Sequence, residues 1–437
     1  MQTTPKIIVL DDDPTGSQTV HSCLLLTRWD PATLSEALHD DAPLFFVLTN
    51  TRSMSAEQAG ERTREVCRGL RQALAQYERP WLVVSRSDST LRGHYPVETD
   101  VLSQELGPFA AHFMTPAFFE GGRITRGGIH YVVGNGTEVR ADQTEFARDS
   151  VFGYSTSYLP DYVQEKTAGR IQSDEVCLFP ATMSDTEMRQ QLAQLEANRC
   201  CAVDAENQSQ MDRFARLVLD AAASGKRFLF RSGASLLTSL AGLPPQPVPA
   251  ERMAHYVRDR RPGLILVGSH VPSATRQLDE LLRSRPVEGI ELNVGALPDR
   301  DGAISRALHE RLQQGHAAGR DVAIYTSRQE RRFDSTRDRL AFGREVSRVL
   351  ISAVAQAPST LGFILSKGGI TSNDVLSEAL ALRTARVVGQ IHPGCSVVVT
   401  PREHRLASVP VVIFPGNVGS DESLRLVYDR LTSNRSA

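Results

Sequence analysis

The sequence lacks the features of a membrane, nucleic-acid-binding or disulfide-stabilised protein. No apolar run approaches the length of about 18 residues that spans a bilayer. Lys and Arg number 49 against 51 Asp and Glu, so the net charge of −2 leaves no basic excess to attract nucleic acid or an acidic membrane. The six cysteines include no Cys-x-x-Cys pair. Because residues 1–13 also lack the apolar segment of a signal peptide, we expect a reduced, cytoplasmic protein.

The remaining composition and the order of apolar segments predict an α/β protein. Hydrophobic residues make up 41% of the 437 positions, which is enough for a sizeable core and two or three domains. Short apolar runs, typical of buried parallel strands, alternate with amphipathic segments such as 55–76, where Ser55 is a candidate N-cap, and 185–197. The predicted strands are residues 7–10, 44–48, 81–84, 176–179, 228–230, 264–267, 322–325, 362–365 and 411–414. We therefore expect two α/β domains with mainly parallel sheets and a ligand cleft between them.

Two segments depart from this alternation. Residues 244–250 are rich in proline and read as a linker, which would divide an N-terminal domain, 1–243, from a C-terminal domain, 251–437. Residues 116–169 are rich in Gly, Arg, Tyr and Thr and show no clear periodicity. A segment of that length is usually a functional loop or a small excursion from the main sheet.

The first candidate site follows the first predicted strand, where residues 11–17 read DDDPTGS. Ligands of open α/β sheets bind beyond the carboxyl ends of the strands. Three adjacent carboxylates also repel one another unless solvent, a cation or hydrogen bonds compensate them. One of these three aspartates could therefore position or deprotonate a substrate hydroxyl, or help to hold Mg²⁺, and the pattern leaves open which of them acts. The alternative is an acidic loop in which one aspartate caps the next segment.

The second candidate site is SRSDSTLRGH at residues 85–94, again directly after a strand. The guanidinium groups of Arg86 and Arg92, with the nearby hydroxyls, could bind a carboxylate or a polyol, because Arg binds carboxylates in a bidentate geometry. The alternative is a solvated turn in which Asp88 caps a helix. The density of polar groups alone does not decide between these interpretations.

The third candidate site is a set of glycine-bearing turns in the second half. SKGGITS at 366–372, VGSH at 267–270 and FPGNVGS at 414–420 each lie between a predicted strand and a predicted helix. Backbone N–H groups in such turns form anion sites, so the three together favour a nucleotide or phosphate ligand. No Gly-x-x-x-x-Gly-Lys-Ser/Thr phosphate loop occurs, and the eleven histidines show no metal-site spacing. The adjacent Cys200 and Cys201 are typical of buried packing rather than redox chemistry.

These stretches resemble the four-carbon acid sugar kinase family, whose members phosphorylate threonate, erythronate or oxo-tetronate with ATP. The resemblance covers essentially the whole chain. It is carried, in order, by residues 12–16, 88–93, 116–118, 144–149, 368–371 and 415–417. It implies a sugar-acid-binding N-terminal domain, an ATP-binding C-terminal domain, Mg²⁺ and a homodimer.

The resemblance also implies roles for individual residues. Asp12 or Asp13 would orient and deprotonate a terminal hydroxyl, while Arg92, with Arg86, would bind the substrate carboxylate. The implied substrate-binding residues are Asp12, Arg86, Asp88, Ser89 and Arg92. The implied ATP-binding residues are Ser269, Gly368, Gly369, Ile370, Thr371, Gly416 and Asn417. At Ile370 the family usually carries Glu, a change that a backbone anion site tolerates because the side chain need not touch phosphate.

Two other functions compete with the kinase. Asp11-x-Asp13-x-Thr15 resembles the first motif of haloacid-dehalogenase-type phosphatases, in which the first aspartate is a nucleophile and the second a general acid. That chemistry also needs a late acidic pair at a strand end, which the sequence does not contain, so we rank it below the kinase. A non-catalytic sensor of a sugar acid or nucleotide is the third possibility, and it would bind its ligand without consuming ATP.

Overall fold

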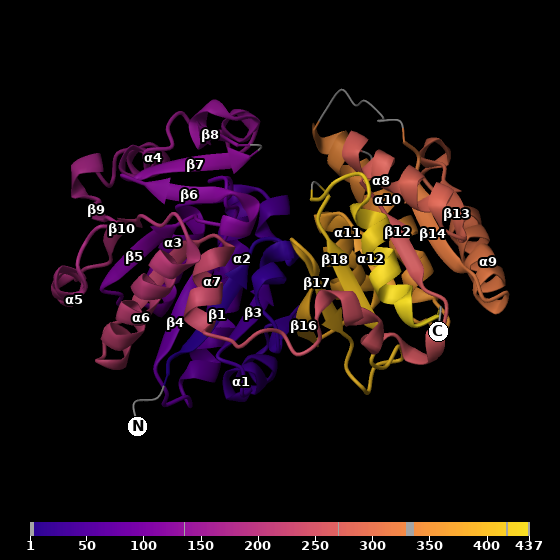
Figure 1. Cartoon of the computed structure of the whole chain (residues 1–437), viewed down its shortest axis with the longest axis horizontal. Helices are drawn as coiled ribbons and strands as arrows, with labels where there is room; N and C mark the ends of the chain where they lie inside the picture. The colour runs from indigo at the N-terminus through magenta and orange to yellow at the C-terminus, as the bar shows by residue number, and fades with distance from the viewer. Residues whose placement is uncertain (1–3, 135, 270, 329–335, 417, 436–437) are drawn as a thin grey trace. The chain divides into compact units, whose positions relative to one another are not determined.

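The computed structural model describes residues 4–134, 136–269, 271–328, 336–416 and 418–435 (Figure 1). The chain divides into two compact units, Met1–Pro244 (unit 1) and Pro245–Ala437 (unit 2). Within the described ranges, no helix has both the length and the apolar character needed to cross a membrane.

Unit 1 is built on a parallel sheet with the strand order β2-β3-β1-β4-β11-β5-β10-β9. Its strands are β1 Lys6–Asp11, β2 Cys23–Leu26, β3 Leu44–Leu48, β4 Trp81–Arg86, β5 Ala111–Thr115, β9 Cys177–Phe179, β10 Arg199–Val203 and β11 Phe228–Ser232. Every residue of β1 and β3 is buried, which explains why these strands read as continuous apolar runs in the sequence.

Helices connect these strands and cover the sheet. They are α1 Pro31–His39, α2 Ala56–Leu74, α3 Val97–Leu106, α4 Leu159–Lys166, α5 Asp185–Gln194, α6 Gln208–Ala223 and α7 Ala234–Ala241. The predicted cap of α2 is confirmed, because the Ser55 side chain accepts a hydrogen bond from the Gln58 backbone and Gln58 caps the Ser55 N–H in return. Such a reciprocal pair satisfies two backbone donors that the first helical turn leaves free.

The aperiodic segment 116–169 forms a small excursion from the main sheet. It contains the antiparallel strands β6 Arg123–Arg126, β7 Ile129–Gly134 and β8 Thr137–Arg140. His130 of β7 lies against the loop that follows β4, where its Nε2 is 2.7 Å from the Ser89 carbonyl oxygen. The excursion thus packs on the second candidate site rather than standing apart from it.

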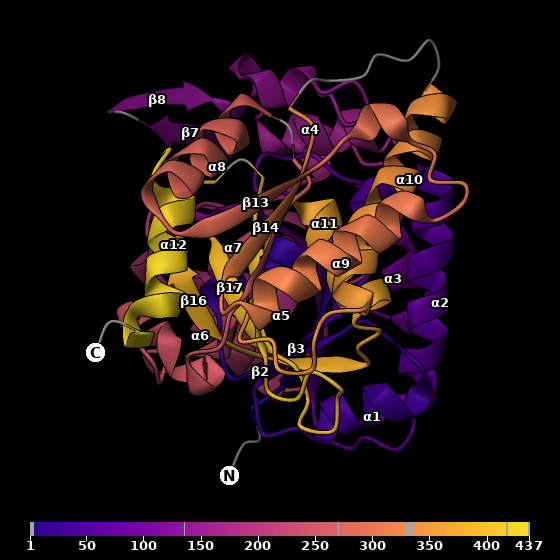
Figure 2. The same ribbon diagram turned by 90° about the vertical axis from the view of Figure 1, so that its right-hand side faces the viewer.

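Unit 2 has the strand order β13-β14-β12-β15-β18-β17-β16. Its strands are β12 Leu264–Val267, β13 Val287–Leu292, β14 Asp321–Thr326, β15 Ile364–Lys367, β16 Thr384–His392, β17 Cys395–Val399 and β18 Pro410–Phe414. Its helices are α8 Pro272–Ser284, α9 Ala303–Ala317, α10 Thr336–Ala355, α11 Gly369–Asp374 and α12 Ser423–Thr432. Figure 2 shows α8 and α12 on one side of the unit 2 strands and α9 and α10 on the other.

The predicted fold class is confirmed, since both units are α/β and the pairing is mainly parallel. The described antiparallel strand pairs are those of the small excursion in unit 1 and those of β17 in unit 2, which runs antiparallel to both β16 and β18.

Candidate active site

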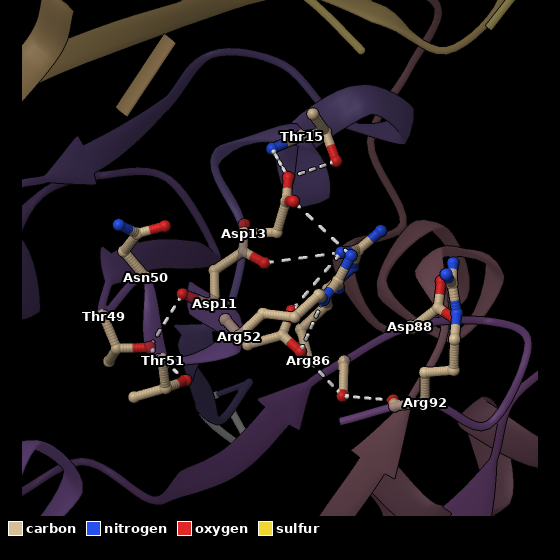
Figure 3. Close-up of polar contacts among 12 residues, drawn as sticks. Asp11, Asp13, Thr15, Thr49, Asn50, Thr51, Arg52, Arg86, Asp88 and Arg92 are labelled. Atoms are coloured by element: carbon tan, nitrogen blue, oxygen red, sulfur yellow. Dashed lines mark hydrogen bonds and ion pairs between the residues drawn. The ribbon is translucent and has the colours of Figure 1, made fainter. Parts of the chain in front are cut away.

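The first two candidate stretches lie side by side in unit 1. β1 is paired with β3 on one side and β4 on the other, all parallel, so the loops after these three strands meet at one edge of the sheet. Figure 3 shows the result: side chains from residues 11–15, 49–52 and 86–92 converge. The structure therefore joins the aspartate cluster and the SRSDSTLRGH stretch into one charged site and adds Arg52 from the loop after β3.

Both carboxylate oxygens of Asp12 accept hydrogen bonds within this site. Arg52 donates to both of its oxygens, from Nη2 to Oδ1 at 2.5 Å and from Nε to Oδ2 at 3.1 Å. Ser87 Oγ donates to Oδ2 at 2.8 Å. The Asp12 side chain is buried. A bidentate Arg–carboxylate pair is geometrically specific, so Asp12 fixes the Arg52 guanidinium in place.

Asp13 caps the short 3₁₀ helix η1, Pro14–Thr19, and stays partly exposed. Its Oδ1 accepts hydrogen bonds from the Thr15 N–H at 2.8 Å and from Thr15 Oγ1 at 2.6 Å, and its Oδ2 lies 3.4 Å from Arg52 Nη1. Burial acts to raise the pKa of Asp13, but Arg52 and the Thr15 hydrogen bonds outweigh it and hold the pKa below its ordinary value. Asp13 is therefore an anion with one oxygen turned toward Arg52.

Asp11 is enclosed in the protein. A Cβ added at Gly16 would come within 2.0 Å of Asp11 Oδ2, and no described residue hydrogen-bonds either carboxyl oxygen. Burial raises the pKa of Asp11 well above its ordinary value, which the Arg86 guanidinium 3.6 Å away only partly offsets. A phosphatase mechanism would need this carboxylate as an exposed nucleophile, and the Gly16 backbone covers it.

Arg86 and Arg92 occupy different environments. The Arg86 side chain is buried, with Nη1 3.6 Å from Asp11 and 3.9 Å from Asp12, so it compensates the aspartate cluster from within the protein. Arg92 is partly exposed and donates from Nε to Asp88 Oδ2 at 2.8 Å. Its Nη1 lies 3.6 Å from a carboxylate oxygen of Asp149 in the excursion. Among the predicted substrate-binding arginines, Arg92 is thus the one with an accessible guanidinium.

Asp88 holds Arg92 rather than capping a helix. It accepts hydrogen bonds from Arg92 Nε and from Thr90 Oγ1. Burial acts to raise the pKa of Asp88, but Arg52 and Arg92 outweigh it and hold the pKa well below its usual range. Ser89, the neighbouring predicted substrate ligand, has a buried side chain.

The backbone of residues 88–92 is held from behind by buried side chains. Each of its five carbonyl oxygens accepts a hydrogen bond at 2.7–2.9 Å from a side chain that lies outside this loop. The pairs are Asp88 and Arg92 with Arg231, Ser89 with His130, Thr90 with Tyr154, and Leu91 with Tyr162. The loop next turns through Gly93 at a φ of 121°, where a Cβ would lie 2.3 Å from Ser87 Oγ. Such support fixes the direction of the functional side chains.

Sequence reasoning missed Arg52 and Glu98. Arg52 follows β3, and its role depends on β3 lying beside β1, which the sequence does not state. Glu98, in the first turn of α3, is buried and accepts a hydrogen bond from Thr51 Oγ1 at 2.5 Å. Burial and the nearby Asp12 carboxylate raise the pKa of Glu98 to about 7. In the sequence, Arg52 is marked only as a basic residue shortly after the predicted strand 44–48, and Glu98 lies in none of the predicted elements.

The glycine turns of unit 2 also converge. β12, β15 and β18 are adjacent and parallel, so the turns after them share one edge of the sheet. A Cβ at Gly268 would come within 2.2 Å of Thr371 Oγ1, and one at Gly416 would lie 3.6 Å from Ser269 Oγ. Gly368 has a φ of 120°, a conformation that other residues rarely adopt. Of the predicted ATP-binding residues, these turns bring together Ser269, Gly368, Thr371 and Gly416.

The other predicted ATP-binding residues have separate placements. Gly369 begins α11, and Ile370, the second residue of the helix, has a side chain that is 63% exposed. Asn417 lies outside the described residues.

Two basic side chains that were not predicted support these turns. Arg328 Nη1 donates to the Ser269 carbonyl oxygen at 2.9 Å. Lys367 is buried and donates from Nζ to the carbonyl oxygens of Pro415 at 3.2 Å and Gly416 at 3.4 Å. Burial lowers the pKa of Lys367 to about 8. Both cations therefore bind backbone carbonyls of the loops expected to hold phosphate.

Within the described ranges, no three His, Cys, Asp or Glu side chains are grouped so that they could hold a metal ion. Mg²⁺ commonly binds through one or two carboxylates together with substrate phosphates. The structure is compatible with that mode and offers no all-protein cage.

Comparison with known proteins decides the family. A model described as the sugar-binding N-terminal domain matches residues 7–240, and another described as the nucleotide-binding C-terminal domain matches residues 264–424. The chain belongs to the four-carbon acid sugar kinase family. This confirms the resemblance stated from the sequence motifs, and the nucleotide-binding description agrees with the glycine turns of unit 2.

One curated relative of this sugar kinase family member is a distant one. The D-erythronate kinase of Heliobacterium modesticaldum (strain ATCC 51547 / Ice1) is 27% identical over 217 residues, which are 48% of this chain and 47% of that protein. The chain therefore matches about half the length of that relative.

Two solved structures share the fold over nearly the whole chain. A proposed tRNA synthase from Salmonella typhimurium LT2 has a TM-score of 0.70 and 17% identity, covering 97% of this chain and 98% of that one. A Haemophilus influenzae protein has a TM-score of 0.65 and 16% identity, covering 97% and 100%. Likeness at these identities shows the fold alone.

Proposed function

We propose that the protein transfers the γ-phosphoryl group of ATP to a hydroxyl of a four-carbon sugar acid of the threonate, erythronate or oxo-tetronate type. Family membership supports a sugar-acid kinase with a nucleotide-binding domain. The D-erythronate kinase relative supports the four-carbon class of acceptor. Residues 1–243 would bind the acid and residues 251–437 the nucleotide.

The observation that carries the proposal is the trio of partly exposed charges in unit 1. The side chains of Arg52, Arg92 and Asp13 are 22%, 25% and 20% exposed, whereas Asp11, Asp12 and Arg86 are buried. A sugar acid carries a carboxylate at one end and hydroxyls along the rest. Guanidinium groups bind carboxylates, and a carboxylate accepts the proton or hydrogen bond of a hydroxyl. The accessible trio therefore matches both ends of such a substrate.

The contacts around each group suggest a division of roles. Arg92 would bind the substrate carboxylate, because Asp88 and Asp149 orient it while its guanidinium stays accessible. Asp13 would orient the acceptor hydroxyl, because its pKa is held low and it remains an acceptor at neutral pH. Asp12 would fix Arg52, and Arg86 would balance the charge of the cluster from beneath. Phosphoryl transfer relies mainly on such positioning and electrostatics.

The glycine turns of unit 2 would bind the triphosphate through backbone N–H groups. Among the described residues that are not its neighbours in the chain, the atom nearest to a Cβ placed at Gly416 is Ser269 Oγ at 3.6 Å, so phosphate oxygens could approach the Gly416 backbone. Ser269 and Thr371 would add hydroxyl donors beside it. Mg²⁺ bound with the triphosphate would neutralise the charge on the β- and γ-phosphate oxygens.

The direct test is an ATP-consumption assay of the whole protein with Mg²⁺ and a panel of acids. The panel contains D- and L-threonate, D- and L-erythronate and their oxo forms, and the product is identified by mass. Formation of a phosphorylated four-carbon acid supports the proposal. ATP binding without consumption on any acid would contradict the acceptor assignment and favour a sensor.

A further inference from the structure

Two cysteines lie opposite each other at the edge of the unit 1 sheet. Cys177 of β9 and Cys201 of β10 are register partners in a parallel strand pair. Neighbouring strands lie about 4.7–4.9 Å apart, and register partners point to the same face of the sheet. Disulfides join Cα atoms separated by about 4.4–6.8 Å. The strand register thus places the Cα atoms of Cys177 and Cys201 within the range that a disulfide spans.

The environments of the two thiols differ in a way that suits a reactive and a resolving cysteine. β9 is the last strand of its sheet, and Cys177 is partly exposed, whereas Cys201 is fully buried. Arg199, at the start of β10, donates from Nε to Cys177 Sγ at 3.5 Å. The neighbouring Cys201 side chain and the Arg199 guanidinium lower the pKa of Cys177 to about 5, although burial acts in the opposite direction. Thiolates rather than thiols react with oxidants, and cations beside them stabilise that form.

We propose that Cys177 and Cys201 are a hydroperoxide-sensitive pair, in which Cys177 is oxidised first and Cys201 resolves it to a disulfide that ties β9 to β10. This inference is independent of the kinase proposal. The proposal also gives Cys201 a different role from Cys200, its neighbour in the sequence. Cys200 points to the opposite face, with its Sγ 4.0 Å from Tyr95 Oη, and remains a packing residue as expected.

The chemistry balances with a hydroperoxide as the oxidant. The Cys177 thiolate attacks the O–O bond of hydrogen peroxide, which breaks to give Cys177 sulfenic acid and hydroxide. The Cys201 sulfur then attacks the sulfenic sulfur, an S–S bond forms, and the sulfenic oxygen leaves as water with the Cys201 proton. Overall, two thiols lose two electrons and two protons, and one peroxide becomes two waters.

The other cysteines offer controls, because their surroundings predict low reactivity. Cys67 and Cys395 are buried, and burial raises the pKa of both; for Cys67 it reaches about 12. Neither is a register partner of another cysteine in the strand pairs of the described chain. Cys67→Ser is therefore a matched control for Cys177→Ser.

The test treats the purified whole chain with a few equivalents of hydrogen peroxide and maps its peptides by mass spectrometry without reduction. We expect a peptide linked through Cys177 in the wild type and in Cys67→Ser, and none in Cys177→Ser. In Cys201→Ser we expect Cys177 to accumulate as a sulfenic acid that dimedone traps. A link to Cys200, a link between two chains, or no oxidation of Cys177 would each overturn the proposal.

A second measurement does not depend on any variant folding. Iodoacetamide is applied to the native wild-type protein at pH 6, and the alkylated cysteines are quantified over time. Cys177 is expected to react at least ten-fold faster than Cys67. Equal rates would contradict the assignment of Cys177 as the reactive thiol.

Discussion

The buried carboxyl of Glu98 makes the stability of unit 1 depend on pH in a defined direction. Its pKa rises from an ordinary value of 4.5 to about 7 because burial and the Asp12 carboxylate disfavour its charged form. Between these two values the folded state holds a proton that the unfolded state has lost. Stability therefore falls as the pH rises from 4.5 to 7 and stays at the lower level above that. Asp11, whose pKa is also raised, acts in the same direction.

Replacing Glu98 by Gln isolates its contribution. Gln keeps a carbonyl oxygen for the hydrogen bond from Thr51 Oγ1 and carries no charge at any pH. A shift of about 2.5 pKa units at about 1.36 kcal/mol each corresponds to a difference of about 3 kcal/mol between acid and alkaline pH. At pH 8 the variant should be more stable than the wild type by up to this amount. In a folding unit of this size, each kcal/mol of stability changes the Tm by about 2–4 °C, so the variant should melt about 6–12 °C above the wild type at pH 8.

Calorimetry of both proteins at half-unit steps from pH 4.5 to pH 8 measures the effect. The control is Glu105→Gln at the other end of α3, where the partly exposed Glu105 pairs with the exposed Arg71 at 3.0 Å. We expect that change to cost under about 1 kcal/mol at both ends of the range. If the Tm difference between Glu98→Gln and the wild type does not grow between pH 4.5 and pH 8, Glu98 is not the buried acid described here.

Three further predictions concern single groups. Arg92→Lys should raise the KM for the sugar acid by about ten-fold or more with little change in the KM for ATP, because a lysine ammonium cannot form the two parallel hydrogen bonds that a guanidinium makes with a carboxylate. An unchanged KM for the acid in steady-state assays would show that Arg92 does not contact the substrate. Gly93→Ala should destabilise unit 1 by about 1–3 kcal/mol, because the positive φ of residue 93 and the short distance from its Cβ position to Ser87 Oγ both disfavour a side chain there. A urea unfolding midpoint equal to that of the wild type would refute this. In the wild type we expect ATP affinity to fall between pH 7 and pH 9, because the Lys367 ammonium deprotonates near pH 8. Lys367→Met should bind ATP more weakly than the wild type at pH 7 and should lose this pH dependence. A calorimetric titration that finds the same ATP affinity for the wild type at pH 7 and pH 9 would contradict the prediction.

The sequence predicted the fold class because parallel strands buried on both faces leave a strong local signal. The run at 44–48 and the run at 264–267 coincide with β3 and β12 at both ends. The antiparallel β16 and β17 were not predicted. In β16, buried and half-buried residues alternate in most of the strand, so no continuous apolar run marks it.

The candidate site was predictable in part, since functional groups follow strand ends in the sequence as they do in space. What local pattern cannot supply is strand order and side-chain direction. Arg52 joins the site only because β3 neighbours β1, and Arg86 faces the aspartates rather than solvent because of where it lies on β4. The roles of these residues, the domain boundary at 244–250 and the homodimer stay predictions.

The most direct test of the central claim compares the wild type with Asp13→Asn. Calorimetry measures ATP binding, and mass spectrometry measures phosphorylated acid formed from ATP, Mg²⁺ and the best acceptor of the panel. We predict equal ATP affinity and at least a hundred-fold loss of product in the variant, because Asp13 serves the acceptor and not the nucleotide. Product formation by Asp13→Asn at the wild-type rate would contradict the account.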